Sequence, residues 1–155
     1  MSNEASFDAA AAHRYFAAEC FNQAWDLISK PDRTPDEDEQ MLRLSLASHW
    51  HWTQRPDYSA EKAAIAYWQT SRIYALLGQT DNARRYGRFC LTASQEPGLP
   101  PFCLGYAYEA LARAAAAAGN QAEKQAYIAE AHRVSETMTD IEARQMLLDD
   151  LATIK

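Results

Sequence analysis

The string SHWHW at residues 48–52 places two imidazoles and two indoles side by side in the chain. Imidazole is the commonest metal ligand among side chains, so the string raises the question of a metal site. On a helix, side chains two residues apart point about 200° apart, and His49 and His51 therefore cannot hold one ion together. His51 could instead pair with His13 or with a carboxylate of the first helix. We favour a histidine packed beside the tryptophans, and we predict no metal.

Two further groups of residues could do chemistry. Three arginines stand close together on one predicted helix: Arg84, Arg85 and Arg88. They could hold an acidic partner or a phosphate, although a solvated outer face is the commoner arrangement. The cysteines, Cys20, Cys90 and Cys103, are odd in number and lack paired spacing, which is typical of small core residues in a reducing compartment. The usual patterns of acyl transfer, nucleotide binding and zinc hydrolysis are missing from the sequence, so we predict neither an enzyme nor a cofactor.

Helices must position these residues, because no segment alternates apolar and polar residues with the period of a strand. The chain is rich in Ala and contains only 5 Gly and 6 Pro, which favours helix. Apolar spacing, caps and breakers predict seven helices, at about residues 7–29, 34–52, 59–77, 80–94, 101–118, 120–136 and 139–154. Loops of a few residues require successive helices to pack antiparallel. We therefore predict an all-α protein of stacked helical hairpins.

Local signals predict several helix ends. Thr34 with Glu37 forms a capping box at the start of the second helix, and Thr139 with Glu142 forms another at the start of the seventh. Gly78 is expected to end the third helix, because glycine tolerates the left-handed conformation of a helix C-terminus.

Length and charge limit the classes of function. A chain of 155 residues suits a single domain over residues 1–155. Its net charge of −6 repels phosphate backbones, so we predict no nucleic-acid partner. No stretch approaches about 18 uninterrupted apolar residues, and residues 1–16 lack a basic leader before an apolar run. We expect no membrane partner, no secretory signal and a cytoplasmic protein.

The sequence repeats internally when Gly78 is placed over Gly119, 41 residues later. Each copy reads as a helix, a glycine turn, a polar cap and a second helix. Tyr67 then falls on Tyr108, and Arg72 falls on Arg113. This pattern resembles the tetratricopeptide repeat over about residues 60–135. The positions that carry the resemblance are Tyr67, Tyr74, Gly78, Ala83 and Pro97 in the first copy and Tyr108, Gly119 and Ala131 in the second.

The resemblance is incomplete. Lys124 and Ala115 stand where the family has a small residue and an aromatic residue. The spacing of 41 residues exceeds the family's period of about 34, and the extra residues lie in the linker at 95–101. The resemblance implies a superhelical stack with a concave groove, and it implies that the seventh helix is a capping helix.

In tetratricopeptide proteins, the first helix of each repeat lines the concave groove. The resemblance therefore implies a groove with these members: Ile65, Trp68, Arg72, Tyr106, Glu109 and Arg113. Arginine forks recognise carboxylates and phosphates, and aromatic side chains supply contact area at low entropic cost. Two alternatives stay open. Glu109 and Arg113 could bond each other on the surface as an i, i+4 pair, and Trp68 and Tyr106 could be core residues.

The favoured hypothesis is a protein- or peptide-binding module whose groove takes a partner, which could be acidic. On this hypothesis, replacing Arg72 and Arg113 by alanine abolishes partner capture and leaves folding intact. A second hypothesis is a homodimer that buries Trp50 or Tyr106. A third is a sensor or enzyme for a small anionic ligand, which requires a closed pocket.

Overall fold

In the computed structural model, residues 7–155 are described, and all regular structure in this range is helical. Residues 1–6 lie outside the described residues. They include the start of the segment, residues 1–16, on which the expectation about a secretory signal rests. The predicted all-α architecture is confirmed. The helices are α1 (Ala9–Ile28), α2 (Pro35–Thr53), α3 (Ala60–Leu76), α4 (Thr80–Ser94), α5 (Pro101–Ala117), α6 (Gln121–Ser135) and α7 (Ile141–Ala152).

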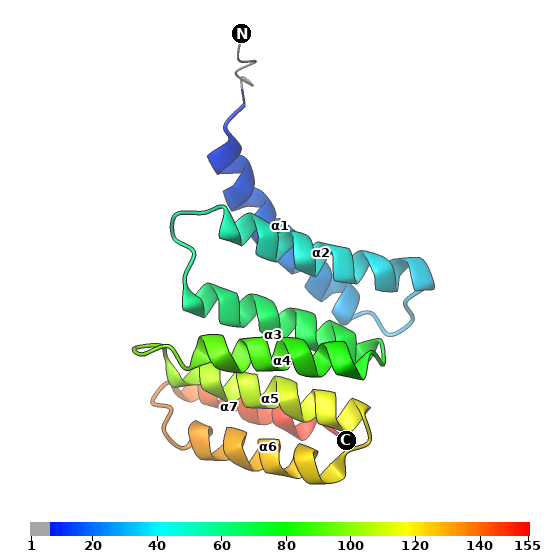
Figure 1. Cartoon of the computed structure of the whole chain (residues 1–155), viewed down its shortest axis with the longest axis vertical. Helices are drawn as coiled ribbons and strands as arrows, with labels where there is room; N and C mark the ends of the chain where they lie inside the picture. The colour runs from blue at the N-terminus through cyan, green and yellow to red at the C-terminus, as the bar shows by residue number, and fades with distance from the viewer. Residues whose placement is uncertain (1–6) are drawn as a thin grey trace. The chain divides into compact units, whose positions relative to one another are not determined.

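The chain divides into two compact units (Figure 1). Unit 1 extends to Tyr58 and consists of the hairpin α1–α2. Unit 2 extends from Ser59 to Lys155 and contains α3 to α7. The prediction of one domain over residues 1–155 stays a prediction.

Small side chains bring the two helices of unit 1 together. Ala17 and Ala24 on α1 and Met41 on α2 are fully buried. Ser48 is also buried, and its hydroxyl donates to the backbone carbonyl of Ala17 at 2.7 Å. Because none of these side chains except Met41 is large, the backbones can approach closely, and the hairpin has a thin apolar core.

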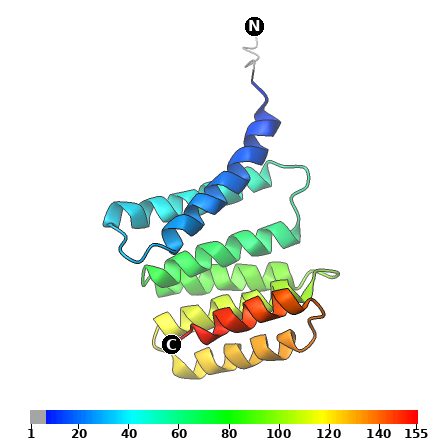
Figure 2. The ribbon, with the colours of Figure 1, turned by 180° about the vertical axis from the view of Figure 1, so that it is seen from behind.

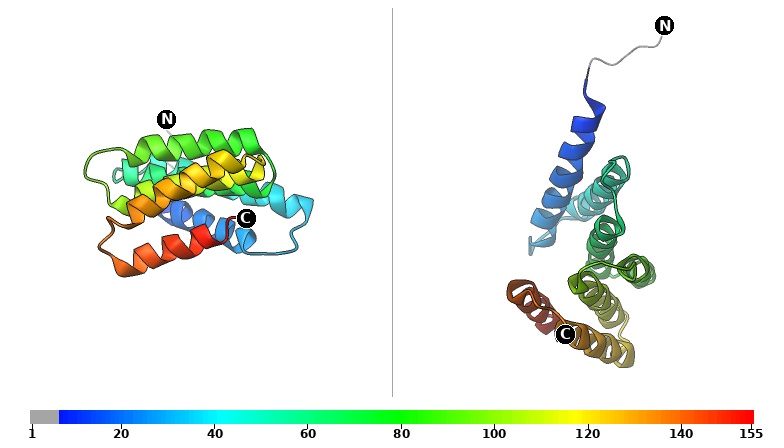
Figure 3. Two further views of the ribbon diagram at one scale, coloured as in Figure 1. Left: turned by 90° about the horizontal axis from the view of Figure 1, so that it is seen from below. Right: turned by 90° about the vertical axis from the view of Figure 1, so that its left-hand side faces the viewer.

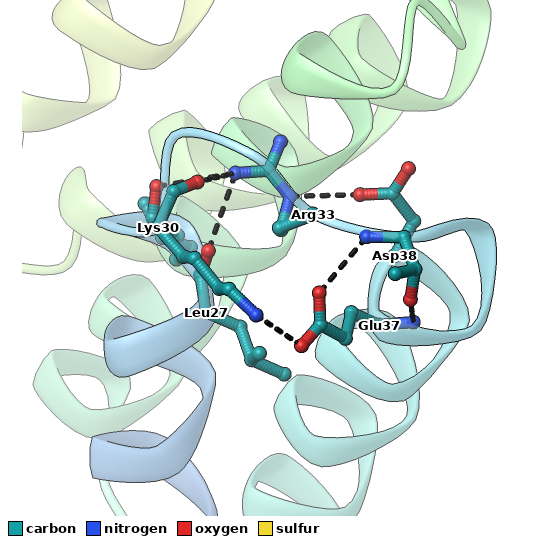
Figure 4. Close-up of polar contacts among 7 residues, drawn as sticks. Leu27, Lys30, Arg33, Glu37 and Asp38 are labelled. Carbon is teal, nitrogen blue, oxygen red and sulfur yellow. Dashed lines mark hydrogen bonds and ion pairs between the residues drawn. The ribbon is translucent and has the colours of Figure 1, made fainter.

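The connection between α1 and α2 is fixed by charge (Figure 4). The guanidinium of Arg33 donates to the carbonyls of Leu27 at 3.2 Å and Lys30 at 2.9 Å, at the end of α1, where the regular helical partners of carbonyls run out. Its Nε donates to the carboxylate of Asp38 at 2.7 Å. Lys30 pairs with Glu37 across the same corner. One arginine therefore ties the end of α1 to the first turn of α2.

The two predicted capping boxes have different outcomes. The box of Thr34 and Glu37 is present, with the Thr34 N–H donating to the Glu37 carboxylate at 2.8 Å. The predicted cap of the seventh helix, Thr139, is wrong by one residue. Asp140 caps α7, and its carboxylate accepts from the N–H of Ala143 at 3.0 Å. The cap is the residue directly before the first helical residue, and the aspartate holds that position.

Unit 2 contains the same hairpin twice. The bounds of α3 and α4 recur 41 residues later as the bounds of α5 and α6. The two turns also match, since Gly78 and Gly119 have φ of 71° and 72°. In each turn the N–H of the residue after the glycine donates, at 2.9 Å, to a carbonyl five residues earlier. The predicted glycine-ended helices and the repeating hairpin are thus confirmed.

Successive hairpins of unit 2 pack in register (Figure 1). The first helix of the second hairpin, α5, contacts both α3 and α4. Arg84 on α4 pairs with Glu123 on α6 at 2.5 Å and links the second helices. This arrangement places α3 and α5, the helices that carry the predicted groove residues, side by side.

Helix α7 completes unit 2 by packing on α5 and α6 (Figure 2) and runs back along α6 (Figure 3). Leu147 is fully buried against α5 at Gly105, where an added Cβ would lie 2.6 Å from the Leu147 Cδ2. The absence of a side chain at Gly105 therefore makes room for α7. The core around this contact consists of Tyr106, Ala131, Met138, Leu147 and Leu151.

Candidate functional site

A buried carboxylate on α5 organises the polar residues of unit 2. Glu109 is 0 % exposed. One of its oxygens accepts from the indole Nε1 of Trp68 on α3 at 2.8 Å, and the other accepts from the Nε of Arg113 one turn along α5. A buried carboxylate is costly unless it is paired and hydrogen-bonded, and both conditions are met here. Glu109 thereby fixes an indole and a guanidinium relative to each other.

A second carboxylate, Asp150 on α7, joins the same network. Its side chain accepts from the hydroxyl of Tyr106 at 2.8 Å. Arg72 lies between the two acids, with Nη1 3.7 Å from an oxygen of Glu109 and 3.7 Å from an oxygen of Asp150. We call these six residues the Glu109 cluster: Trp68, Arg72, Tyr106, Glu109, Arg113 and Asp150. It contains two cations and two anions, so its charges balance.

Arg113 ties the cluster to the last turn of α7. Its Nη2 donates to the backbone carbonyl of Asp150 at 2.9 Å and to the hydroxyl of Thr153 at 2.7 Å. Cations near a helix C-terminus interact favourably with the helix dipole and satisfy carbonyls that lack a helical partner. Arg113 therefore holds α7 on α5 while it pairs with Glu109.

Burial tunes the ionisable groups of the cluster. It lowers the pKa of Arg72, and the nearby charge of Arg113 acts in the same direction, whereas Glu109 and Asp150 raise the pKa. Burial also raises the pKa of Tyr106, as does the hydrogen bond that its hydroxyl donates to Asp150. Both effects keep Tyr106 a neutral donor, so the cluster offers no general base of the phenolate type.

Five of the six predicted groove residues come together in this cluster. The i, i+4 pair of Glu109 and Arg113 does form, but inside the protein rather than on its surface. Trp68 and Tyr106 pack edge to face with ring centroids 5.0 Å apart, and Tyr106 belongs to the core. The sixth predicted residue, Ile65, is half-buried one turn before Trp68 and supplies no polar group.

Asp150 was missed by the sequence reasoning, although a signal for it exists. Trp68 and Glu109 occupy equivalent positions of the two hairpins, 41 residues apart. A further step of 41 residues leads to Asp150 on α7. Thr153 follows Arg113 by 40 residues. Helix α7 thus continues the positional pattern of α3 and α5, and the equivalent residues Trp68 and Glu109 touch.

Comparison of the chain with protein-family models, with curated proteins and with solved structures gave no match. Within residues 7–155, no helix is long and apolar enough to cross a membrane.

In unit 1, the structure brings together the two secondary candidates, His13 and His51. Their Nδ1 atoms lie 2.9 Å apart, and their ring centroids lie 5.1 Å apart. Trp50 packs edge to face on both imidazoles, with centroids 5.3 Å and 4.9 Å away. Phe16 on α1 covers the ring of His51 at 5.4 Å. The pairing of His51 with His13 was one of the two alternatives open from the sequence.

The other histidine of the string, His49, has a separate partner. The Nε2 of His49 lies 2.7 Å from the hydroxyl of Tyr58, and burial lowers the pKa of His49. Among residues 7–155, no group of three or more His, Cys, Asp or Glu side chains is placed to hold a metal ion. His49 and His51 therefore belong to different environments, as their angular separation on a helix predicts.

The remaining candidates do not converge on one site. Arg84 is engaged by Glu123 on α6, whereas the guanidinium of Arg85 lies 5.3 Å from the ring centroid of Phe89. The basic patch is thus divided between an ion pair and an aromatic contact.

The buried thiols are poor nucleophiles. Burial raises the pKa of Cys90 to about 12 and that of Cys103 to about 11. Because the thiolate is the reactive form, neither thiol is a nucleophile near neutral pH.

A pocket of about 370 Å³ lies elsewhere in unit 2, between the linker after α4 and the end of α6. Its lining contains none of the six predicted groove residues. This pocket is therefore not the closed pocket that the small-ligand hypothesis requires. The lining consists of Ser94, Leu99, Pro100, Pro101, Leu104, Arg133, Val134 and Thr137.

Proposed function

We propose that this chain is a binding module of the tetratricopeptide type, which binds a segment of a protein or peptide along the face of α3 and α5 that carries the Glu109 cluster. The recurrence of the hairpin with identical helix bounds and turns supports this proposal, as does the packing of α5 on both α3 and α4. In the family that the sequence resembles, the first helices of the repeats form the groove.

The observation that carries the proposal is the preorganisation of polar groups on that face. The side chains of Arg72, Arg113 and Asp150 are 18 %, 15 % and 32 % exposed, whereas Glu109 beneath them is fully buried. Charged tips held by a buried partner lose little entropy when they bind, and rigid donors and acceptors beside an aromatic ring suit a peptide. The cluster therefore combines partly exposed polar groups with a fixed geometry.

The balance of charge refines the expected partner. An acidic side chain approaching Arg72 must compete with Glu109 and Asp150 for the same guanidinium. A peptide backbone offers carbonyls to the arginines and N–H groups to Asp150 without bringing net charge. The proposed ligand is consequently an extended segment read through its backbone, with an acidic residue as an added contact.

The contacts of the two arginines decide which variant tests the groove. Arg113→Ala would leave the buried Glu109 without its closest cation and would loosen α7, so binding and folding would be lost together. Arg72→Gln is the sharper change, because the buried Glu109 keeps Trp68 and Arg113 as partners when Arg72 is replaced. Arg85→Gln, on the exposed face of α4, is the matched control.

The test is selection from a displayed peptide library with the wild type, followed by binding measurements with both variants. An enriched peptide that binds the wild type and the Arg85→Gln control, but binds Arg72→Gln at least about tenfold more weakly, supports the proposal. Circular dichroism verifies that both variants keep their helicity. Enrichment of no peptide, or equal binding by both variants, refutes it.

Self-association is a second candidate because unit 1 exposes large apolar side chains. The exposed fractions of Phe7, Tyr15, Phe16 and Trp50 lie between 44 % and 66 %. Of the two residues proposed for a dimer interface, Tyr106 is buried within unit 2, so only Trp50 is accessible to a second copy. Sedimentation at high concentration tests this candidate, and a monomer eliminates it.

A further inference from the structure

We propose that the contact between His13 and His51 is a proton-sensitive latch that fastens α1 to α2 near neutral pH and opens when both imidazoles are protonated. This inference concerns unit 1 and is independent of the proposed groove in unit 2.

The geometry of the pair limits how many protons it can hold. With the Nδ1 atoms 2.9 Å apart and the ring centroids 5.1 Å apart, the two nitrogens face each other almost head-on. One Nδ1 must donate its proton and the other must accept it. The contact is therefore compatible with two neutral rings or with a single positive charge. When both rings are charged, two N–H groups point at each other and the hydrogen bond is lost.

The immediate surroundings of the pair do not compensate a second charge. The rings of Trp50 and Phe16 cover the imidazoles, and in residues 7–155 neither imidazole forms an ion pair with a carboxylate. Burial lowers the pKa of His51, and the charge of His13 lowers it further.

The charged residues nearest to the pair along the two helices are cations. Arg14 follows His13 directly on α1, and Arg55 lies one turn after His51, just beyond the end of α2. Arg55 is itself held by Asp57 at 2.7 Å, so that carboxylate is already engaged. A doubly protonated pair would therefore lack a stabilising anion.

The location of the pair gives its protonation a structural consequence. His13 stands one turn before Ala17 on α1, and His51 stands one turn after Ser48 on α2. The hydroxyl of Ser48 donates to the carbonyl of Ala17 at 2.7 Å, so the latch lies beside the small buried residues that hold the hairpin together. Because that core is thin, loss of the latch is expected to loosen the first turns of α1.

The direction of the pH dependence follows from the lowered pKa. A free histidine has a pKa of about 6.5, and the pKa of His51 in the folded unit lies below its ordinary value. Between these two values the unfolded chain binds more protons than the folded chain, so stability rises with pH. The contribution of the latch is complete above the pKa of the unfolded histidine. It is lost as the pH falls through that value towards the lowered pKa of the folded state.

The test combines ring titration with amide exchange on the full chain. NMR follows the four imidazoles, and hydrogen exchange of residues 9–17 is compared between about pH 7.5 and about pH 5, corrected for the chemical rate. In the wild type, His51 should titrate below the ordinary histidine pKa of about 6.5, and its titration curve should show coupling to a second ionisable ring. Protection of residues 9–17 should fall roughly fivefold on acidification, the factor for losing one net hydrogen bond of about 1 kcal/mol.

The variants decide between the latch and a structural coincidence. In His51→Gln, the extra loss of protection on acidification should vanish, whereas the His132→Gln control should behave as the wild type. His13→Gln provides the reciprocal test if His51→Gln loses helicity. A wild-type His51 ring that titrates as a single uncoupled site, or unchanged acid loosening in the variants, would overturn the proposal. So would a pH dependence that disappears with a chelator, because the pair would then be acting as a metal ligand.

Discussion

Replacing Glu109 by glutamine tests whether the buried carboxylate holds unit 2 together. Glutamine keeps the shape of the side chain and removes its charge. In the native protein, one oxygen accepts from Trp68 and the other accepts from Arg113. A glutamine amide must direct its NH₂ group at one of these two donors in either orientation, so one hydrogen bond becomes a clash of donors.

The expected cost follows from the burial of the group. Breaking a buried ion pair by removing one partner costs about 3–5 kcal/mol, and a hydrogen bond to a charged group contributes about 1.5–3 kcal/mol. Because glutamine retains one acceptor and the volume of the side chain, we expect the free energy of unfolding to fall by about 2–4 kcal/mol. For a chain of this size, that corresponds to a decrease in melting temperature of roughly 5–15 °C.

Glu123→Gln is the matched control. Glu123 also pairs with an arginine, Arg84, but its side chain is 38 % exposed. An exposed ion pair contributes about 0–1 kcal/mol, so this variant should melt close to the wild type. Thermal and urea unfolding, followed by helical circular dichroism, measures both changes. If the two variants lose the same stability within about 0.5 kcal/mol, burial does not determine the contribution of Glu109 and the reasoning fails.

The turns and the core provide two further tests. Gly119→Ala and Gly78→Ala should each lower the free energy of unfolding by about 1 kcal/mol. Both positions have φ near 70° and an added Cβ meets no atom within 4 Å, so the substitution introduces only backbone strain. Clearly unequal losses of stability in urea unfolding would contradict the equivalence of the two turns. Burial raises the pKa of the Cys90 thiol to about 12, so the thiol should resist alkylation at about pH 8 in the native protein and react after denaturation. Mass spectrometry of the labelled peptides measures the extent of alkylation. Rapid labelling of the native protein would contradict the burial of Cys90.

The helices and turns could be predicted from the sequence because their determinants are local. The box of Thr34 and Glu37 is formed by residues three apart, and the glycine turns depend on a backbone conformation that few other residues adopt. The same locality explains the error at α7, where Thr139 and Asp140 are both good caps and only the first helical residue decides between them.

The candidate site could be predicted only in part, because burial is a tertiary property. The spacing placed Glu109 and Arg113 on one helix face but left open whether they met on the surface or in the interior. The choice depends on what covers α5, and that is α7, a helix outside the aligned repeat. The contact of His13 with His51 has the same character, since it depends on the rotation of α1 against α2.

The spacing of 41 residues nevertheless predicts contacts between side chains as well as the repeated hairpin. In a stack of similar hairpins, equivalent positions of successive helices are neighbours, so a position that recurs along the sequence becomes a row of contacts in space. Trp68, Glu109 and Asp150 form such a row: the first donates to the second, and Arg72 lies between the second and the third. A donor, a buried acid and a half-exposed acid therefore follow one another at one position of the repeat. Because the guanidinium of Arg72 bridges Glu109 and Asp150, changing either acid should alter the environment of the other. Binding experiments should therefore vary the row as a whole rather than any single residue.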